Sequence, residues 1–445
     1  MRLDGKAHTV FRIQAQFKND MSNYTLCERM IARWLDSLPL LRSTVKDAYQ
    51  RLNYILCSDG VLLQMNPRAQ ITELEEKVEH FFGYFDKSCW SPDGRHVLYH
   101  RHISADGVEI VIHDLLDKAT HVVAKATTWN WQQGAMAQWW PKKNGEWIAF
   151  NTMERNRLVG YIVDAKGDGL VKELSMPIQA VSPRGDCAIS LNYTRLARLR
   201  PDYGYMVDVA NLRPNMSDES DGLWRIDISS GQVTLVVSLA ALRRNQPVPS
   251  MQGALHKVNH VVFSPDGSRI AFMHRWIGAE GKFSRLYTAS PDGSEVFLLA
   301  DDRMVSHYCW RDASHLLAWA RKVPYGDHYF LFTDRTPQVE IIGAGVLDAQ
   351  GDGHPSFSPD RRWLVTDTYP GRDRKSSLIL YDIREGMVHV VGRFFSPWRF
   401  NGPDRCDLHP RWSPDGNWVA IDSVHTGRRG LYLIKVNGLT KARAS

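Results

Sequence analysis

The sequence of 445 residues has few cysteines, no long hydrophobic run and no serine-hydrolase motif. Its six cysteines are scattered without a Cys-x-x-Cys pair, so we expect reduced thiols and a cytoplasmic protein. No apolar stretch approaches membrane-spanning length, and residues 1–8 have no apolar core of a secretory signal. The absence of Gly-x-Ser-x-Gly argues against a hydrolase of the prolyl-oligopeptidase type.

Positive charge is present but spread along the chain. The formal net charge is +6, and lysine and arginine are dispersed, which favours an ordinary solvated surface over nucleic-acid binding. One basic cluster, Arg195 to Arg200, stands out and could receive an acidic substrate.

A repeat occupies most of the chain. Its clearest copies carry Ser-Pro-Asp-Gly followed by a short apolar run, which is the turn and strand chemistry of a β-hairpin. Seven copies can be placed at intervals close to those of a propeller blade, except for one longer interval. Their key positions are Trp90, Trp139, Val181, Phe263, Trp310, Phe357 and Trp412. The repeat predicts an all-β, seven-bladed propeller of four-stranded antiparallel blades over residues 81–445, with an insertion at about 193–220.

Residues 1–80 lack the repeat, and we expect them to form a small, partly helical cap on the propeller. Residues 27–38 and 45–56 read as helical or mixed, and residues 73–80 as a short charged helix. A strand near residues 54–57 or 61–64 is expected to close the ring, because closure removes exposed sheet edges.

Histidine occupies the same position in four successive copies, three residues before the key aromatic. These are His260, His307, His354 and His409. A repeat places equivalent residues at equivalent points, so the four imidazoles should reach one rim of the channel. Three or four imidazoles could hold a first-row metal, with Asp422 or Gln138 adding an oxygen donor. The same histidines could instead cap strand entries or transfer protons without a metal.

Two further groups should lie on the face of the histidines. The insertion is rich in arginine and tyrosine, which pair with carboxylates and move protons; its candidates are Asn192, Tyr193, Arg195, Arg200 and Tyr203. It could equally be a loop held down by its own aromatics. Tryptophans beside glutamine amides are typical of sugar-binding surfaces, although propellers also bury tryptophan between blades. These candidates are Trp129, Trp131, Gln133 and Gln138.

The Ser-Pro-Asp-Gly hairpins resemble the repeats of TolB-like propellers over about residues 81–436. The His-Pro starts at His354 and His409, together with the Asp and His residues at the second-strand ends, look like the oligogalacturonate lyase group of seven-bladed propellers. That family is cytoplasmic and cleaves uronic-acid oligosaccharides by β-elimination at a manganese site. The resemblance implies metal ligands at His307, His354 and His409, with His260 or His425 as further candidates, although zinc or another first-row metal would also suit them.

The resemblance implies a lyase that acts on an acidic, uronic-acid-containing oligosaccharide. A metal and an arginine would neutralise the uronate carboxylate, and a base would remove the neighbouring proton. Candidate catalytic residues are Tyr193, Arg195, Arg200 and His260, and Tyr369, Arg405 and Asp422 join the substrate-binding group. The alternative is a non-catalytic TolB-like scaffold that binds a protein or glycan. Neither function calls for nucleic acid or a membrane, and a homo-oligomer stays open.

Overall fold

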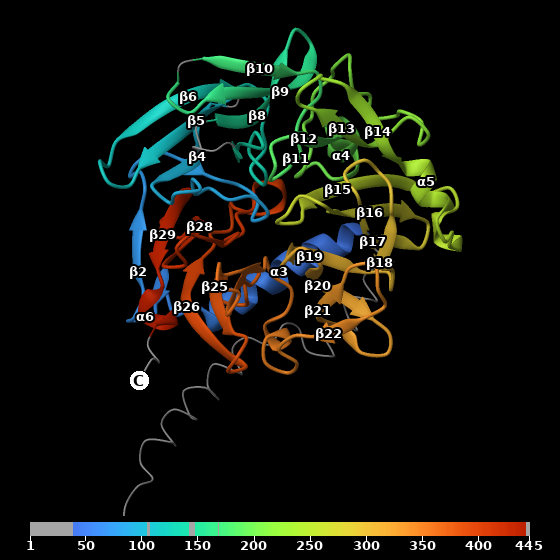
Figure 1. Ribbon diagram of the computed structural model, residues 1–445. Helices are drawn as coiled ribbons and strands as arrows, with labels where there is room; N and C mark the ends of the chain where they lie inside the picture. The colour runs from blue at the N-terminus through green and yellow to red at the C-terminus, as the bar shows by residue number, and fades with distance from the viewer. Residues whose placement is uncertain (1–38, 105–106, 142–146, 168, 442–445) are drawn as a thin grey trace, which may run out of the picture.

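The computed structural model describes residues 39–104, 107–141, 147–167 and 169–441, which form seven antiparallel sheets around a central axis. Figure 1 looks along this axis and shows the sheets as the blades of a propeller. Six sheets have four strands and one has five, so the predicted seven-bladed propeller is confirmed. The predicted segment 27–38 lies outside the described residues.

The chain builds the blades in sequence order, from the innermost strand outward. Blade 1 consists of β3 (His80–Phe81), β4 (His96–Ser104), β5 (Gly107–Asp114) and β6 (Thr120–Ala126), and blade 2 of β7 (Gln138–Trp140), β8 (Trp147–Glu154), β9 (Arg157–Asp164) and β10 (Leu170–Leu174). Blade 3 consists of β11 (Ala180–Val181), β12 (Cys187–Leu191), β13 (Gly222–Asp227) and β14 (Val233–Ser238). Blade 4 consists of β15 (Leu255–Phe263), β16 (Ile270–Gly278), β17 (Gly281–Ala289) and β18 (Phe297–Ala300).

Blades 5 to 7 follow, and two of them gain strands from the N-terminal segment. Blade 5 consists of β19 (Val305–Trp310), β20 (His315–Lys322), β21 (Gly326–Thr333) and β22 (Val339–Ile341). Blade 6 consists of β23 (Ser356–Phe357), β24 (Trp363–Asp367), β25 (Lys375–Asp382) and β26 (Met387–Phe395), with β1 (Leu63–Met65) added from the N-terminal segment. Blade 7 consists of β27 (Arg411–Trp412), β28 (Trp418–Ser423) and β29 (Gly430–Lys435), with β2 (Gln70–Glu73) added from the N-terminal segment.

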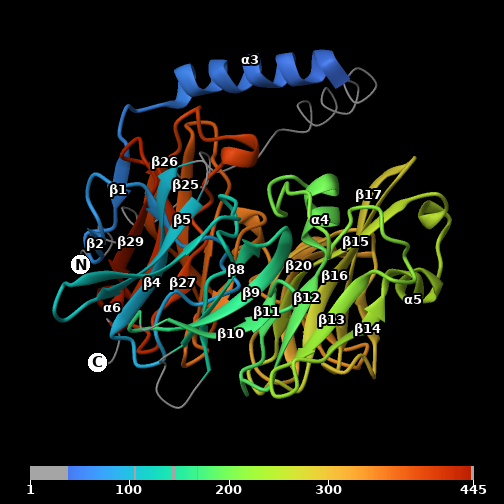
Figure 2. The same cartoon turned by 90° about the horizontal axis from the view of Figure 1, so that it is seen from above.

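The few helices lie between or beside the blades. They are α3 (Pro39–Cys57), α4 (Tyr193–Leu199), α5 (Leu239–Arg244), α6 (Asn437–Thr440) and the 3-10 turns η2 (Pro249–Met251), η3 (Asp348–Gln350) and η4 (Gly402–Asp404). Figure 2 shows α3 across the same face of the ring that carries α4. The Tyr54 ring of α3 packs on Phe395 and Trp398 of blade 6, with centroids 5.7 and 6.0 Å apart. In the described residues, no helix is long and apolar enough to span a membrane.

Ring closure uses a different strand from the one expected. Strand β2 pairs with β29 and completes blade 7, with Ile71 opposite Ile434. Residues 54–57 are instead the end of α3, and part of 61–64 belongs to β1, which extends blade 6. Residues 73–80, expected to be a short helix, instead end β2 at Glu73, bend over 74–78 and begin β3 at His80, because β2 and β3 enter two different blades within this short stretch. The closing strand therefore joins N-terminal and C-terminal segments in one sheet.

The Ser-Pro-Asp-Gly turns are held by a repeated set of hydrogen bonds. In blade 7, Ser413 Oγ donates to Asp415 Oδ1 (2.5 Å) and accepts from the backbone N–H of Trp418 (2.9 Å). Gly416 has φ of +68°, and a Cβ there would lie 3.5 Å from Cδ of Pro359 in the preceding blade. Serine, aspartate and glycine are thus each required by the turn or by contact between blades.

Four of the seven key positions hold a tryptophan, and each indole N–H donates to a backbone carbonyl of the preceding blade. The pairs are Trp90 to Arg411 (3.4 Å), Trp139 to Cys89 (3.0 Å), Trp310 to Val262 (3.1 Å) and Trp412 to Ser356 (3.1 Å). The acceptors lie on innermost strands or directly beside them. The repeat positions therefore form contacts between neighbouring blades as well as contacts within each blade.

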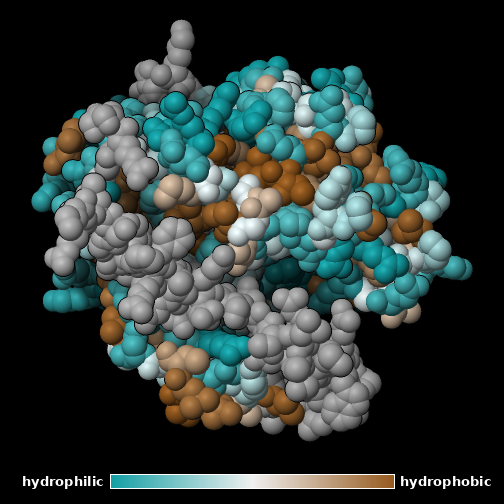
Figure 3. Space-filling model, turned by 90° about the horizontal axis from the view of Figure 1, so that it is seen from below, coloured by the Kyte–Doolittle hydropathy of each residue, from teal (hydrophilic) through white to brown (hydrophobic). Residues whose placement is uncertain are grey.

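On the side of the molecule shown in Figure 3, the visible hydrophobic residues form patches among hydrophilic ones. The buried hydrophobic side chains gather within and between the blades, and the largest cluster spans blades 2, 3 and 4. The innermost strands are thereby held from both flanks, which gives the axis a rigid lining.

The contribution of one indole hydrogen bond to the free energy of unfolding can be measured with one substitution. Trp310→Phe removes the bond to Val262 of blade 4 as well as part of the ring. Trp363→Phe is the matched control, because this buried tryptophan lies against His389 and Arg362 of its own blade. We expect Trp310→Phe to lower the free energy of unfolding in denaturant by about 1 kcal/mol more than the control. Equal losses would contradict a role for the indole N–H.

Candidate functional site

Four histidines of the repeat converge near the axis, as their spacing predicts. The rings of His307 and His354 have centroids 4.1 Å apart, and those of His354 and His409 are 4.3 Å apart. His260 stands apart from these three, stacked at 4.5 Å on the ring of Tyr84. Three imidazoles therefore form one cluster and the fourth faces a tyrosine.

Backbone strain accompanies two of these histidines. His260 and His409 have φ of 55° and 46°, a left-handed conformation that few non-glycine residues adopt. A break in strand register between Asn259 and Val262 accompanies the first of them. Such conformations persist only where the surrounding structure imposes them, and they concentrate at functional sites.

Hydrogen bonds fix which ring nitrogen of each histidine is free. His409 Nδ1 lies 2.8 Å from the carbonyl oxygen of Gly83, which can only accept, so Nδ1 carries the proton. His354 Nδ1 donates to Asp367 at 2.8 Å. The Nε2 atoms of both rings are buried without a hydrogen-bond partner among the described residues. Two imidazole nitrogens thus point into the cluster with no protein group to satisfy them.

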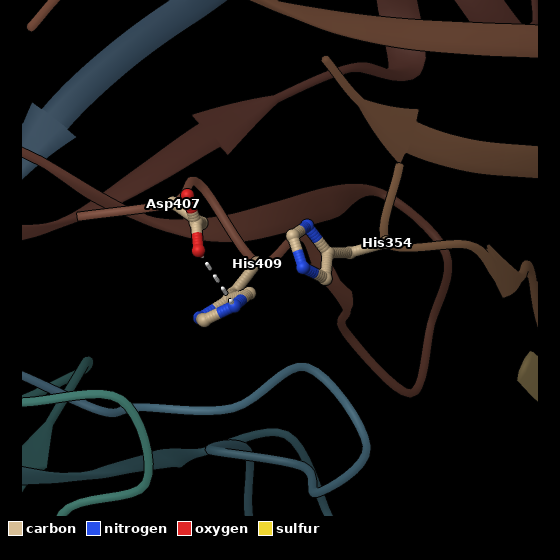
Figure 4. A group of neighbouring side chains, drawn as sticks. All are labelled: His354, Asp407 and His409. Carbon is tan, nitrogen blue, oxygen red and sulfur yellow. Dashed lines mark ion pairs between the residues drawn. The ribbon is translucent and has the colours of Figure 1, made fainter. Parts of the chain in front are cut away.

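The third histidine and a carboxylate complete the group. His307 Nδ1 lies 2.9 Å from Asp352 Oδ1. Asp407 lies beside His409, with Oδ2 3.8 Å from Nε2, as Figure 4 shows. Ligand atoms of His354, Asp407 and His409 all lie within 4.8 Å of one another. We call His307, His354, His409 and Asp407 the imidazole centre.

The imidazole centre fits a divalent first-row cation. Its donor set of nitrogen and carboxylate oxygen suits such metals, including manganese and zinc. In metal-binding histidines, the ring nitrogen that does not bind the metal usually forms a hydrogen bond to an acceptor. Here the acceptors are Asp352, Asp367 and the backbone carbonyl of Gly83. The two orphaned Nε2 atoms are the observation that supports a metal at this place.

Charge around the cluster separates the pKa values of the three rings. Burial, together with the neighbouring His354, holds the pKa of His409 well below its ordinary value. Burial also lowers the pKa of His307, although Asp352 opposes it. Burial acts on His354 in the same direction, but Asp367 overcomes it and raises the pKa of this ring.

A cleft of about 830 Å³ reaches the outer contacts of the imidazole centre, because Asp352, which bonds His307, is among its lining residues. Six cationic side chains line it: Arg200, Lys257, Arg275, Lys282, Arg303 and Arg321. Two carboxylates line it as well, and both are engaged, since Asp352 bonds His307 and Asp202 pairs with Arg405 and Arg200. We call this cleft the basic cleft. Asp352 lines its wall and also bonds His307 of the imidazole centre.

The insertion supplies one wall of the basic cleft through Arg200, while two of its predicted catalytic residues face inward. The Tyr193 hydroxyl donates to Ile178 O and Gln179 Oε1, and burial raises the pKa of Tyr193 well above its ordinary value. Arg195 is buried, with Nε 2.5 Å from Asp221 Oδ2. The structure therefore gives both residues a role in folding the insertion and places neither on the cleft.

Of the other insertion residues, one has a structural role and another lies beside the histidines. Asn192 caps α4 by accepting from the backbone N–H of Arg195 (3.0 Å), which is a structural role. Tyr203 lies edge-on to His260 at 5.0 Å, and its hydroxyl accepts from Arg405 (2.9 Å). Arg405 also donates to Asp407 (2.8 Å), which connects the insertion to the imidazole centre.

In the tryptophan and glutamine group, Gln133 and Gln138 are buried, and Trp129 and Trp131 are half-buried against the core of the propeller. Trp129 and Trp131 meet edge to face at 4.7 Å, and Arg429 covers Trp131. Gln138 accepts from the backbone N–H of Val181 (3.2 Å) and joins blades 2 and 3. Gln133 is buried, and its side-chain amide has no partner among the described residues. None of these predicted sugar contacts lines the basic cleft.

Three further candidates lie around the rim. Asp422 accepts from the backbone N–H groups of Phe82 (2.9 Å) and Gly83 (3.0 Å), so it anchors the segment that carries Tyr84. His425 packs on Phe394 and Tyr432, with centroids 5.5 and 4.7 Å away, and does not join the imidazole centre. Tyr369 is 43% exposed, with its ring 5.9 Å from that of His354, and remains a candidate contact for a ligand.

Sequence reasoning missed several groups at the site. Tyr84, which touches all four histidines, lies outside the repeat positions. Asp352 and Asp407 could have been found, because each stands two residues before a histidine in consecutive blades, as Asp352-Gly-His354 and Asp407-Leu-His409. Lys257 carried no signal beyond its place three residues before His260.

The fold and the site define a seven-bladed propeller with an imidazole centre beside a basic cleft, and solved structures share this fold. An oligogalacturonate lyase from Vibrio parahaemolyticus is 14% identical with a TM-score of 0.58, covering 84% of this chain and 97% of that one. An oligogalacturonate lyase in complex with manganese is 16% identical with a TM-score of 0.59, covering 84% and 96%. These likenesses confirm the predicted resemblance in fold.

The remaining comparisons are weaker. TolB from Acinetobacter baumannii is 14% identical over 77% of this chain and 81% of its own, with a TM-score of 0.38, too low to support an argument. No protein-family model and no curated protein matches the sequence.

The pair of His354 and Asp367 makes a titration prediction. The folded pKa of His354 is raised, so the pair stabilises the fold below the unfolded histidine pKa, and this contribution is lost as the pH rises through the folded pKa. In Asp367→Asn the carboxylate is gone and burial dominates, so the pKa should fall below the ordinary value of about 6.5. NMR titration of the histidine rings measures this.

The control is Asp312→Asn, which removes a carboxylate 2.8 Å from the more exposed His315. It should leave the His354 titration where it was. A His354 pKa that stays raised in Asp367→Asn would contradict the assignment of Asp367 as the group that overcomes burial.

Proposed function

We propose that this chain is a lyase that cleaves an acidic, uronic-acid-containing oligosaccharide by β-elimination, with a divalent cation at the imidazole centre. The observation that carries the proposal is the link through Asp352, which lines a cleft with six lysine and arginine side chains and bonds His307 of a centre that has two unpartnered imidazole nitrogens. The shared fold of the oligogalacturonate lyase structures supports the same reaction class, and the manganese complex favours that metal.

Charge selects the substrate. Arg200 and Arg275 line the basic cleft, and a guanidinium can hold a carboxylate through two parallel hydrogen bonds. A chain of uronates would place one carboxylate beside these arginines and further ones beside Arg303 and Arg321. A neutral sugar of the same size would bring no negative charge to these cationic groups.

The reaction needs an anion stabilised next to the carboxylate. Removing the proton at the carbon that bears the carboxylate leaves negative charge on that group, and fixed positive charge stabilises it. A cation held by His354, His409 and Asp407, with His307 beside them, would supply a Lewis acid that draws electron density from the carboxylate. Asp367 and Gly83 hold the imidazole rings in the orientation that frees Nε2.

Metal content and lyase activity test the proposal together. The native protein, incubated with manganese and dialysed, should hold about one equivalent by elemental analysis and produce rising ultraviolet absorbance from galacturonate oligosaccharides. The double variant His354→Ala, His409→Ala should lose both, because it removes two of the three grouped ligands. His425→Ala removes another buried histidine outside the imidazole centre and should retain both.

The opposite results would separate two functions. A native protein that takes up neither manganese nor zinc would overturn the metal site. Metal without cleavage of any uronate would leave a propeller that binds a protein or glycan without catalysis. Circular dichroism of both variants establishes that they are folded.

Arg275 should contribute to the binding of the carboxylate. Arg275→Met removes a charged hydrogen-bond donor from the basic cleft, so KM should rise about tenfold or more, since such bonds contribute about 1.5–3 kcal/mol. Arg361→Met, at an exposed turn outside the cleft, should leave KM unchanged. Initial rates over a range of galacturonate concentrations measure the difference, and an unchanged KM in Arg275→Met would remove this residue from the binding site.

A further inference from the structure

Lys257 has an unusual place for a lysine. It lies on the innermost strand β15 of blade 4, is 4% exposed, and lines the basic cleft. Its Nζ donates to the backbone carbonyl of Leu199, 3.3 Å away in α4. Among the described residues, no carboxylate lies within ion-pair distance of this amine. A lysine buried in this way lacks the partner that usually compensates its charge.

The charged groups around Lys257 are mostly cations. Arg200 and Asp202 face it from the segment after α4, Arg275 from β16 and Lys282 from β17. The carboxylate of Asp202 is already paired with Arg405 and with Arg200. Burial, then the charges of Arg275 and Arg200, lower the pKa of Lys257 to about 7. Near neutral pH, a large share of this amine is therefore uncharged.

Lys257 is better placed for proton transfer than the neighbouring His260. The His260 ring is stacked on Tyr84, with Nε2 3.4 Å from the Tyr84 hydroxyl, and it does not line the basic cleft. Lys257 does line the cleft, together with Arg200 and Arg275, the two arginines that would hold a uronate carboxylate and whose charges act on its amine. The proton to be removed sits on the carbon next to that carboxylate.

We propose that Lys257 is the base that removes the proton next to the uronate carboxylate, an inference that rests on the proposed function. The neutral amine takes the proton from C5, and the C–H electron pair forms the C4–C5 double bond. The C4–O bond breaks, and its electron pair stays on the departing oxygen. The new ammonium group returns its proton to that oxygen, which restores the neutral amine and leaves one unsaturated and one saturated sugar end.

The uncharged state can be tested without any substrate. Competitive labelling with acetic anhydride over a pH series, followed by peptide mass spectrometry, gives the pH at which each lysine becomes reactive. Lys257 should become reactive with a midpoint near pH 7, and exposed Lys118 serves as the internal standard. A Lys257 midpoint at the ordinary lysine value of about 10.4 would overturn the proposal, whatever the chain cleaves.

The catalytic role is tested by two substitutions in the metal-loaded protein. Lys257→Arg keeps a positive charge but cannot lose its proton, and Lys257→Met removes both. In both, kcat on galacturonate oligosaccharides should fall about 10²–10⁴-fold while KM changes far less. Lys118→Met should keep the native rate. In the native protein, kcat/KM should rise with pH through about 7, and this limb should vanish in Lys257→Arg.

Each result has a separate meaning. A native rate in Lys257→Arg would overturn the role of Lys257 while leaving the proposed lyase standing. A loss confined to KM would make Lys257 a binding group instead of the base. A native chain that cleaves no uronate would overturn the proposed function and the catalytic role together, while the labelling midpoint still decides whether the amine is uncharged.

Discussion

The contact between neighbouring innermost strands is the constraint on which the rest of the structure depends. Four indole N–H groups bind carbonyls of the preceding blade, and turn glycines such as Gly416 lie beside a proline in the turn of the preceding blade. The four indole bonds hold neighbouring blades together at four of the seven boundaries between blades. His307 lies in the innermost strand of blade 5, and His354 and His409 stand two residues before the innermost strands of blades 6 and 7. The indole bond from Trp412 to Ser356 holds together the two blades that carry His354 and His409. The repeat thus builds the fold and the site with one set of positions.

The fold could be predicted because the residues that define its turns and strands are close together in the sequence. Turn residues at fixed positions and alternating strands need no long-range information, and seven copies identify seven blades. The closing strand could not be predicted in the same way. Residues 70–73 are short and partly polar, and only pairing with β29 at the far end of the chain makes them a strand. Such pairing between distant segments leaves little trace in either one alone.

The site was predictable to the extent that it follows the repeat. The three clustered histidines share one repeat position, whereas His425 stands at a second-strand end and turns toward Phe394. Tyr193 and Arg195 have the residue types of a catalytic loop, but their buried polar atoms are bonded to Gln179 and Asp221 of blade 3 and its flanking segments. Residue type shows what a side chain can do, and only the packed structure shows which way it faces.

The net charge of the sequence is small and dispersed, yet folding brings six cationic side chains to one cleft. Placing like charges together costs free energy in the absence of an anion, and burying Lys257 among them shifts that cost onto its protonated form. The unpartnered nitrogens of His354 and His409 carry a similar cost a short distance away. Folded proteins tolerate such local costs where function requires them. A bound polyanion and a cation would relieve both at once, because each supplies the charge that the neighbouring protein groups lack.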